Sequence, residues 1–416
     1  MIQIYLVPGF MGFQSIGDLC YFRRVPQMLG QLLGELGHDR VEVHECPTFP
    51  SGSIARRAQR ALQFISDHGG KEAESIHIVG HSTGGLDARL LAAPGVRLVP
   101  GVMEEQIGKR IHSVVTISTP HYGTPMANLL LALPFQKTLR MIGFLGLAPR
   151  GRAALLGLAR VMNMVARADD WMGRTDTFLD TVVNKVLKGI GKEADDPIWD
   201  FLREISNDQG AAIQLTLEAM HLFNAAVADR PGTRYSSIVT VAPPPPGSFR
   251  REHFISPVKA ASTFVFWALY RMAASVSKQY PYTALDIEAL NLNDHSAPIV
   301  IRKSSNDGIV PCQSQAYGKV LDVVLGDHLD VVGQFPGSGG DRHADWLPCG
   351  ADFGEDQFRH AWSLVAREIS GNLPVKRRAA RLAPAPPPVI VEPARERKAP
   401  SSKNGKPKSK IISAAN

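Results

Sequence analysis

The feature that most constrains the fold is a serine held between glycines where a strand meets a helix. A β-branched run, Ile76–Val79, leads into Gly-His-Ser-Thr-Gly at residues 80–84, and a helical pattern continues through Leu91. A serine in such a tight turn needs flanking glycines, because a Cβ there would meet neighbouring backbone. The turn would hold the Ser82 hydroxyl at the carboxyl end of a sheet, beside the N–H groups of the helix. The alternative is a glycine-rich turn without chemistry.

Short apolar runs alternate with helical patterns around this motif. The predicted strands are Ile2–Val7, Val41–His44, Ile76–Val79, Ser113–Ile117, Tyr235–Val241, Ile299–Lys303 and Val320–Val324. Helices are predicted at Val25–Leu36 and Ile54–Asp67. Nearly continuous apolar strands separated by helices predict an α/β protein whose parallel sheet is covered on both faces.

Two insertions and a tail complete the predicted organisation. Residues 128–230 are rich in Leu, Ala and Met with helical spacing and predict a helical cap, and residues 243–292 form a second, irregular insertion. Residues 376–416 are rich in Pro, Ala, Lys and Arg, and they cannot bury enough apolar surface to offset their ordering entropy. We therefore expect a catalytic domain at 1–375 and a disordered tail.

The basic character of the chain lies in that tail. Residues 376–416 carry eleven Lys and Arg and two Glu, a charge of +9, whereas the whole chain carries +7. A solvated tail without a specific partner is the simpler interpretation, and an anionic membrane surface is the alternative. The tail has no interleaved aromatic residues, which argues against specific nucleic-acid binding. The first residues lack a signal-peptide pattern and the longest apolar stretch, 260–270, is too short to span a bilayer, so a cytoplasmic location is expected.

Three segments resemble bacterial triacylglycerol lipases. They are the Gly-His-Ser-x-Gly-Gly-Leu-x-x-Arg motif at 80–89, the strand and Thr-Pro-His-x-Gly loop at Val114–Pro125, and the segment Leu217–Ala225 followed by Arg234-Tyr235. The likeness covers roughly residues 1–130 and 215–335. It implies the α/β-hydrolase fold, with helices on both faces of a mostly parallel sheet and a helical cap or lid. It also implies a lipase or esterase activity.

The resemblance also implies an oxyanion hole. In these lipases one N–H donor comes from the loop after the first strand and the other from the residue after the nucleophile. The matching residues are Phe10 and Thr83. The sequence has Pro8 where the family usually has a histidine, but that histidine is not a donor to the oxyanion.

The acid and the base are expected downstream of the serine, in the order Ser, Asp, His. Asp307 follows a predicted strand in the sequence Asn-Asp-Gly-Ile-Val-Pro and resembles the family's acid, although an Asx turn would also explain it. His328, in His-Leu-Asp-Val-Val-Gly-Gln, resembles the family's base, and His343 is its rival. Three other histidines are excluded, His81 because its side chain should point away and the other two because they precede the acid: His112 and His121.

The same resemblance suggests a structural calcium site, while the chemistry itself needs no cofactor. The matching ligands are Asp330 and the backbone carbonyl of Gln334, and a carboxylate with carbonyl oxygens suits calcium. Asp286 lies near the place expected for the partner carboxylate. The alternative is that Asp330 only caps or braces the histidine loop.

The leading hypothesis is a serine carboxylic-ester hydrolase that forms an acyl-enzyme on an acyl ester or lipid. Thioesters or storage polyesters would use the same three residues, and a non-enzymatic scaffold of the same fold is the alternative from a different class. Four apolar residues of the cap are candidates for lining an acyl pocket, although ordinary core of packed cap helices is the better explanation of any one of them: Phe135, Leu139, Phe144 and Leu147.

Overall fold

The computed structural model describes residues 1–10, 15–16, 19–99, 104–131, 210–245, 257–275, 301–335, 337, 347 and 349–371. The chain divides into two units, residues 1–382 and 383–416. The second unit, and most of the predicted cap at 132–209, lie outside the described residues, so the predicted cap and tail stay predictions.

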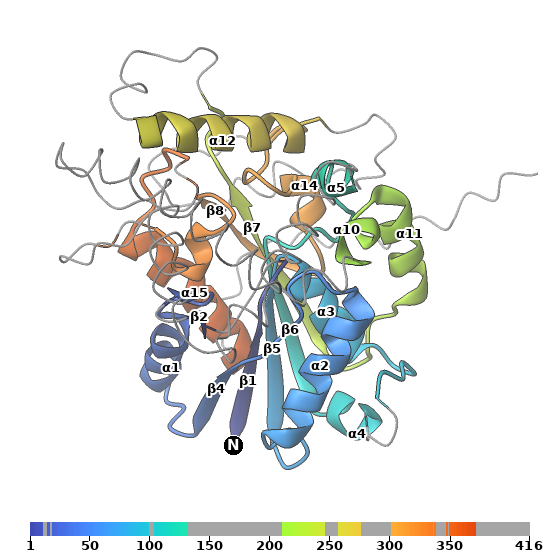
Figure 1. Cartoon of the computed structure of the whole chain (residues 1–416). Coiled ribbons are helices and arrows are strands. Elements are labelled where there is room, and N and C mark those ends of the chain that lie inside the picture. Colours follow the sequence, from blue (N-terminus) through green and yellow to red (C-terminus); the bar gives the residue numbers. More distant parts are fainter. Residues whose placement is uncertain are drawn as a thin grey trace, which may run out of the picture. The chain divides into compact units, whose positions relative to one another are not determined.

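A six-stranded parallel sheet forms the centre of the first unit (Figure 1). Its order is β4-β1-β5-β6-β7-β8, and every neighbouring pair is parallel. The strands are β1 (Ile2–Val7), β4 (Val41–Glu45), β5 (Ser75–His81), β6 (Ile111–Ile117), β7 (Arg234–Val241) and β8 (Lys319–Leu325). Because all six run the same way, their carboxyl ends meet at one edge of the sheet, where parallel sheets of this kind bind ligands.

Both faces of the sheet are covered by helices, as the alternating apolar residues of β1 require (Figure 1). Ile4 and Leu6 pack in the cluster that contains residues of α1 (Val25–Glu35) and α15 (Glu355–Ser370). Tyr5 and Val7 point to the other face. There they join residues of α2 (Ile54–Asp67) and α3 (Thr83–Ala92).

The ends of these helices follow from local sequence. Pro26 lies in the first turn of α1, where the N–H it lacks has no helical partner. Ser53 caps α2, because its side chain accepts a hydrogen bond from the N–H of Arg56 at 3.4 Å. α15 ends at Gly371, whose φ of 73° is a left-handed conformation that glycine adopts at low cost.

One predicted strand is wrong in its described part. Residues 301–303 of the predicted strand Ile299–Lys303 are not extended into the sheet, and the two residues before them lie outside the described residues. β7 pairs with β6 along one edge and with β8 along the other, so neither edge of β7 is free to accept another strand. The segment instead leads into the loop that carries Asp307.

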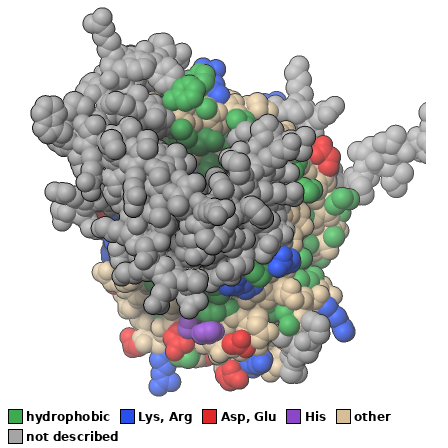
Figure 2. All heavy atoms as spheres, in the orientation of Figure 1, with side chains coloured by type: hydrophobic (Ala, Val, Ile, Leu, Met, Phe, Trp, Pro, Cys, Tyr) green, Lys and Arg blue, Asp and Glu red, His purple; other side chains and the backbone are tan. Residues whose placement is uncertain are grey.

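The predicted irregular insertion at 243–292 contains a helix, α12 (Pro257–Ala273), which lies above the carboxyl ends of the strands in Figure 1. Phe266 and Tyr270, four residues apart, are buried with ring centroids 5.9 Å apart, and they fix one face of α12. Phe264 and Val265 are 54% and 49% exposed, and Figure 2 shows hydrophobic side chains in the same upper region.

The remaining elements are short. They are the antiparallel pair β2 (Ser15–Ile16) and β3 (Leu19–Cys20), the helices α4 (Glu104–Gly108), α5 (Met126–Leu131), α10 (Gly210–Gln214), α11 (Leu217–Ala226) and α14 (Cys312–Gln315), and the 3-10 turn η2 (Asp330–Val332). Of the helices within the described ranges, none combines the length and the apolarity needed to cross a bilayer.

Candidate active site

Ser82 lies at the junction of β5 and α3, in the turn that the sequence predicts. Its φ is 54° and its ψ is −129°, and its N–H donates to the carbonyl of Ile117 at 2.9 Å. A Cβ at Gly80 would come within 2.4 Å of the Gly84 carbonyl oxygen, and a Cβ at Gly84 within 2.1 Å of the Val7 carbonyl oxygen. The predicted need for glycine on both sides of the serine is therefore confirmed.

The loop after β1 lies against the serine. A Cβ at Gly9 would be 2.6 Å from the Cβ of Ser82, so this glycine permits a close approach that no other residue would. Phe10 follows directly, and Thr83 is the first residue of α3 and is buried. Phe10 and Thr83, the two predicted oxyanion donors, are thus each one residue away from this contact.

Asp307 and His328 are in direct contact. The Nδ1 atom of His328 lies 2.7 Å from the Oδ2 atom of Asp307, and the backbone N–H of His328 donates to the Asp307 carbonyl at 2.9 Å. Asp307 is fully buried and His328 is 3% exposed. The loops after β7 and β8, predicted from separate motifs, therefore meet as an acid–imidazole pair.

Ser82 is joined to this pair through its neighbour. The Nε2 atom of His81 lies 2.8 Å from the carbonyl oxygen of His328, and the two imidazole rings are 4.8 Å apart between centroids. Within the described residues, Ser82 Oγ makes no hydrogen bond to the His328 ring. In an unliganded site such a contact is often long and shortens only when substrate binds.

The Asp307 carboxylate is saturated with donors. Two backbone N–H groups donate to Oδ1, and two side chains join His328 at Oδ2; the four partners besides His328 are Ile309 at 3.0 Å, Val310 at 2.7 Å, Thr240 at 2.8 Å and Gln315 at 3.1 Å. A buried carboxylate is costly unless its lone pairs are satisfied, so these groups hold the acid in one orientation.

Gln315 is a bracing residue that the sequence did not indicate. It is fully buried on α14, and its Oε1 atom accepts from the N–H of Thr240 at 2.7 Å. Its Nε2 atom donates to Asp307 and also to the carbonyls of Thr240 and Val310, both at 3.1 Å. Ser118 Oγ lies 2.7 Å from Thr240 Oγ1, which extends the bracing to the end of β6. The sequence around Gln315 gives no sign of this role, because its partner Thr240 lies far away in the chain.

A buried ion pair supports the loop before Phe10. Arg57 of α2 and Asp87 of α3 are both fully buried, with guanidinium nitrogens 2.9 Å from Asp87 Oδ2. The Arg57 guanidinium also donates to the Pro8 carbonyl and, at 2.6 Å, to that of Phe49. Burial raises the pKa of Asp87 to about 6, and the adjacent Arg57 opposes this rise.

The other histidines are occupied elsewhere or lie outside the described residues. His121 is fully buried, with Nε2 3.0 Å from Thr116 Oγ1 and its ring stacked on Tyr317. Burial and the adjacent Arg89 keep its pKa well below the usual value. His112 is exposed near the amino end of β6. The rival base, His343, lies outside the described residues, so it is not tested against His328.

Asp330 lies in a tight acidic turn after His328. The ligand atoms of Asp327, Asp330 and Cys349 lie within 4.8 Å of one another. Asp330 Oδ2 already accepts the N–H of Asp327 at 2.8 Å, and the side-chain amide of Gln334 donates to the carbonyls of Cys20 and Tyr21.

This donor set fits calcium only in part. Calcium takes six to eight oxygen ligands, whereas two carboxylates and a thiol offer fewer, and sulfur is not a ligand that it prefers. The described hydrogen bonds of Asp330 fit the bracing alternative. Asp286, the guessed partner carboxylate, lies outside the described residues.

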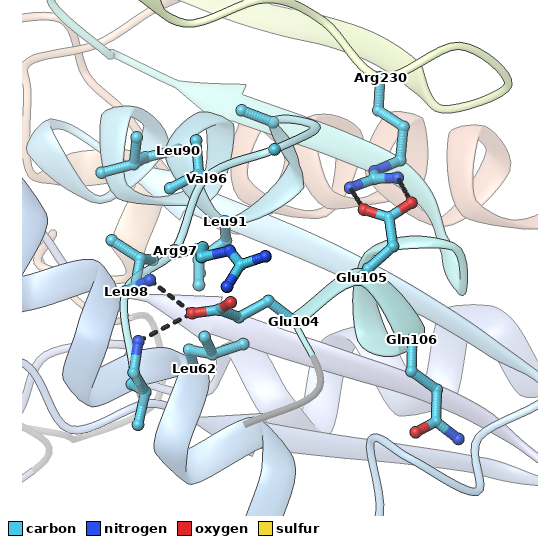
Figure 3. Close-up of a pocket in the computed structure, with 13 residues that line it drawn as sticks. Leu62, Leu90, Leu91, Val96, Arg97, Leu98, Glu104, Glu105, Gln106 and Arg230 are labelled. Atoms are coloured by element: carbon cyan, nitrogen blue, oxygen red, sulfur yellow. Dashed lines mark hydrogen bonds and ion pairs between the residues drawn. The ribbon is translucent and has the colours of Figure 1, made fainter. Parts of the chain in front are cut away.

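A cavity of about 790 Å³ lies at the far end of α3, about 15 Å along the helix from the nucleophile by the usual rise per residue. Apolar residues such as Leu62 and Leu90 line it, and three of its four charged residues, Glu104, Glu105 and Arg230, have protein partners (Figure 3). Arg230 pairs with both Glu105 carboxylate oxygens at 2.9 and 3.0 Å. Its lining includes none of the predicted site residues. The candidates for an acyl pocket in the cap all lie outside the described residues.

Comparison with known proteins supports the fold. The model of the PGAP1-like alpha/beta domain matches residues 55–188. EstA from Clostridium botulinum superposes with a TM-score of 0.50 at 20% identity, covering 88% of this chain and 87% of EstA. The chain has the α/β-hydrolase fold. The predicted fold class is thus confirmed, and the sheet order and the serine turn belong to it.

Two further relatives carry lipase names. A triacylglycerol lipase of Vibrio cholerae is 28% identical over 128 residues, which are 30% of this chain and 35% of the lipase. The chain therefore matches about a third of the length of that relative. Lipase 1 from Pelosinus fermentans superposes with a TM-score of 0.47 at 17% identity, covering 88% of this chain and 98% of that lipase. The predicted resemblance to bacterial lipases and esterases is confirmed.

Replacing Gln315 with Leu should lower the turnover number about 10- to 100-fold, because the freed Asp307 would misalign His328, and small misplacements of reacting groups have effects of this size. The measurement is steady-state hydrolysis of p-nitrophenyl butyrate. Gln313→Leu is the matched control, since Gln313 is also buried on α14 and makes no hydrogen bond to Asp307. Equal losses in the two variants would show that packing of α14, not alignment of the acid, is responsible.

Asp87 should make stability depend on pH. Because its folded pKa of about 6 lies above the ordinary 3.8, the unfolding free energy relative to Asp87→Asn should rise as the pH falls through 6, and this gain is lost again as the pH rises. The expected slope is about 1.4 kcal/mol per pH unit between those two values. Urea unfolding of both proteins at pH 7.5, 6 and 5 measures it. A difference that stays constant over this range would refute the raised pKa.

Proposed function

We propose that the protein is a serine ester hydrolase that cleaves acyl esters through an acyl-enzyme on Ser82. The observation that carries this proposal is the buried Asp307–His328 contact of 2.7 Å, which is anchored to the residue before a serine in a nucleophile turn. A serine hydroxyl becomes a useful nucleophile only when an imidazole takes its proton and a carboxylate orients that imidazole. All three groups occur here in the chain order of the fold.

The proposed reaction has two halves. The Oγ atom of Ser82 attacks the ester carbonyl while Nε2 of His328 takes its proton, and the alcohol leaves with that proton. Water then attacks the acyl-enzyme by the same route and releases the acid. Asp307 holds Nδ1–H of His328 throughout. The N–H groups of Phe10 and Thr83 stabilise the oxyanion, and each such donor contributes roughly 10²- to 10³-fold in rate.

The substrate class follows from what the site resembles. The Vibrio cholerae relative is named a triacylglycerol lipase, and we propose an acyl ester or lipid as the substrate of this chain. A thioester or polyester would use the same groups, but no described feature favours either. An anionic membrane partner for the tail and a cytoplasmic location stay predictions from the sequence, since residues 376–416 lie outside the described residues.

Ser82→Ala should abolish hydrolysis of p-nitrophenyl butyrate, with a loss of about 10⁴-fold or more, because the nucleophile is removed while the fold is kept. A fluorophosphonate probe should label the wild-type protein and leave Ser82→Ala unlabelled. Circular dichroism checks that both proteins are folded. Turnover by Ser82→Ala at the wild-type rate would reject the nucleophile, and a folded wild-type protein that neither reacts with the probe nor hydrolyses esters would favour a scaffold.

We also propose, from the lipase resemblance, that Asp330 and the backbone carbonyl of Gln334 take part in a structural calcium site. A ligand bound only by the folded state stabilises it, so EGTA should lower the thermal midpoint of the wild-type protein by several degrees. Asp330→Asn should remove that sensitivity. If EGTA leaves the wild-type midpoint unchanged, Asp330 serves only to brace the turn through its bond to the N–H of Asp327.

A further inference from the structure

Two buried side chains outside the proposed catalytic set join three of its parts. Tyr21 follows β3 and is 5% exposed, and His81 is the last residue of β5 and is fully buried. The Tyr21 hydroxyl lies 2.9 Å from the N–H of Gly9 and 2.7 Å from Nδ1 of His81. Nε2 of His81 lies 2.8 Å from the His328 carbonyl oxygen. His81 was expected to point away from the site, but its ring instead lies behind His328.

The donor and the acceptor of each of these three hydrogen bonds can be assigned. The His328 carbonyl can only accept, so Nε2 of His81 must carry a proton and donate it. In a neutral imidazole Nδ1 then accepts, and the Tyr21 hydroxyl donates to it. The Tyr21 oxygen in turn accepts from the N–H of Gly9. Burial, followed by the nearby His328, keeps the pKa of His81 well below its usual value, which favours this neutral form.

Three residues of this hydrogen-bonded series are, or directly precede, a proposed catalytic residue. Gly9 precedes Phe10, the proposed oxyanion donor; His81 precedes Ser82; and the last acceptor belongs to the base His328 itself. The three bonds therefore span the distance between the oxyanion loop and the base, with the nucleophile between them.

The segment around Tyr21 is also fixed to the loop that carries the base. The Gln334 side chain donates to the carbonyls of Cys20 at 2.8 Å and Tyr21 at 3.0 Å. The N–H of Arg23 donates to the carbonyl of Val332 at 2.9 Å. The Tyr21 hydroxyl thus bridges from a segment bound to the base loop onto the oxyanion loop.

We propose that Tyr21 and His81 are positioning residues, a two-side-chain relay that sets the spacing of Phe10 and His328 about Ser82. The inference rests on the proposed hydrolase function. The relay has no chemical step of its own. It acts through geometry, and its loss should lower the turnover number while substrate affinity changes little.

The first test compares two tyrosines. Tyr21→Phe removes the central hydroxyl and should lower the turnover number for p-nitrophenyl butyrate about 10- to 100-fold, with KM within about twofold. Tyr5→Phe is the matched control, because the Tyr5 hydroxyl is also buried and bonded, to Gln3 and His68, but lies in β1 away from the site. Its turnover number should equal that of the wild-type protein. Equal turnover numbers for the two variants would overturn the proposal.

A double variant tests whether the two residues act as one unit. His81→Asn can keep an acceptor for Tyr21 near the Nδ1 position but loses the donor to His328, so it should be about as slow as Tyr21→Phe. The double variant should be no slower than the slower single variant, since a relay broken once is already lost. If the fold-loss in turnover number of the double variant equals the product of the two single losses, the two residues act independently and the relay is rejected. Thermal melting identifies any variant that fails to fold, and Tyr21→Phe against Tyr5→Phe then decides alone.

The two proposals fail in different ways. If the wild-type protein hydrolyses the ester and Ser82 reacts with a fluorophosphonate, the hydrolase assignment stands whatever the Tyr21 variants do, and only the relay is in question. If the folded wild-type protein does neither, the hydrolase assignment fails, and the relay as a catalytic positioning device fails with it.

Discussion

The backbone of Ser82 is the constraint on which the rest of the site depends. A φ of 54° with a ψ of −129° is a sparsely populated conformation for a residue with a side chain, and it costs of order 1–3 kcal/mol. Such a conformation persists only where its surroundings enforce it. Here they do so by contact, since Gly80 and Gly84 leave no space for a Cβ and the Ser82 N–H is bound to β6. The loop that carries Phe10, the proposed oxyanion donor, and His328, the proposed base, are both located relative to this turn.

Two buried carboxylates near the turn show how environment separates roles. Asp307 is surrounded by two backbone N–H groups and by three side chains, so every direction of its negative charge meets a donor. Asp87 has Arg57 at one oxygen, while its other oxygen is buried with no hydrogen-bond partner among the described residues. A carboxylate such as Asp307, with both oxygens hydrogen-bonded, is held in one orientation, as a group that aligns an imidazole must be. Burial raises the pKa of Asp87 and the adjacent Arg57 opposes this rise, as expected for a structural ion pair.

The features predicted correctly from the sequence are those that a local pattern of residues determines. The strand periodicity located β1, β4, β5, β6, β7 and β8 to within a few residues, and the glycines around Ser82 followed from the geometry of one turn. Asp307 and His328 were found by motif, and their contact is a consequence of the parallel sheet bringing strand ends together. The predicted strand at 299–303 failed because an apolar run does not reveal that both edges of β7 are already paired.

The groups that were missed are those whose partners lie far away in the chain. Tyr21 and His81 are 60 residues apart, His81 and the His328 carbonyl 247 apart, and Gln315 and Thr240 75 apart. No spacing rule relates such pairs, since only the assembled sheet defines them. The bonds of His81 could not be predicted for the same reason, because they depend on Tyr21 and on the loop after β8.

Nine of the ten residues of α3 are buried, including the charged Asp87 and Arg89, so the helix that begins at the nucleophile has almost no surface of its own. Nearly every substitution in it must be matched by a change in another element. Sequence change is accommodated more easily in segments near the carboxyl edge of the sheet such as α12, where Phe264 and Val265 are exposed. In the proposed hydrolase, a new acyl preference would arise in such segments while α3 and the residues packed around it stay the same.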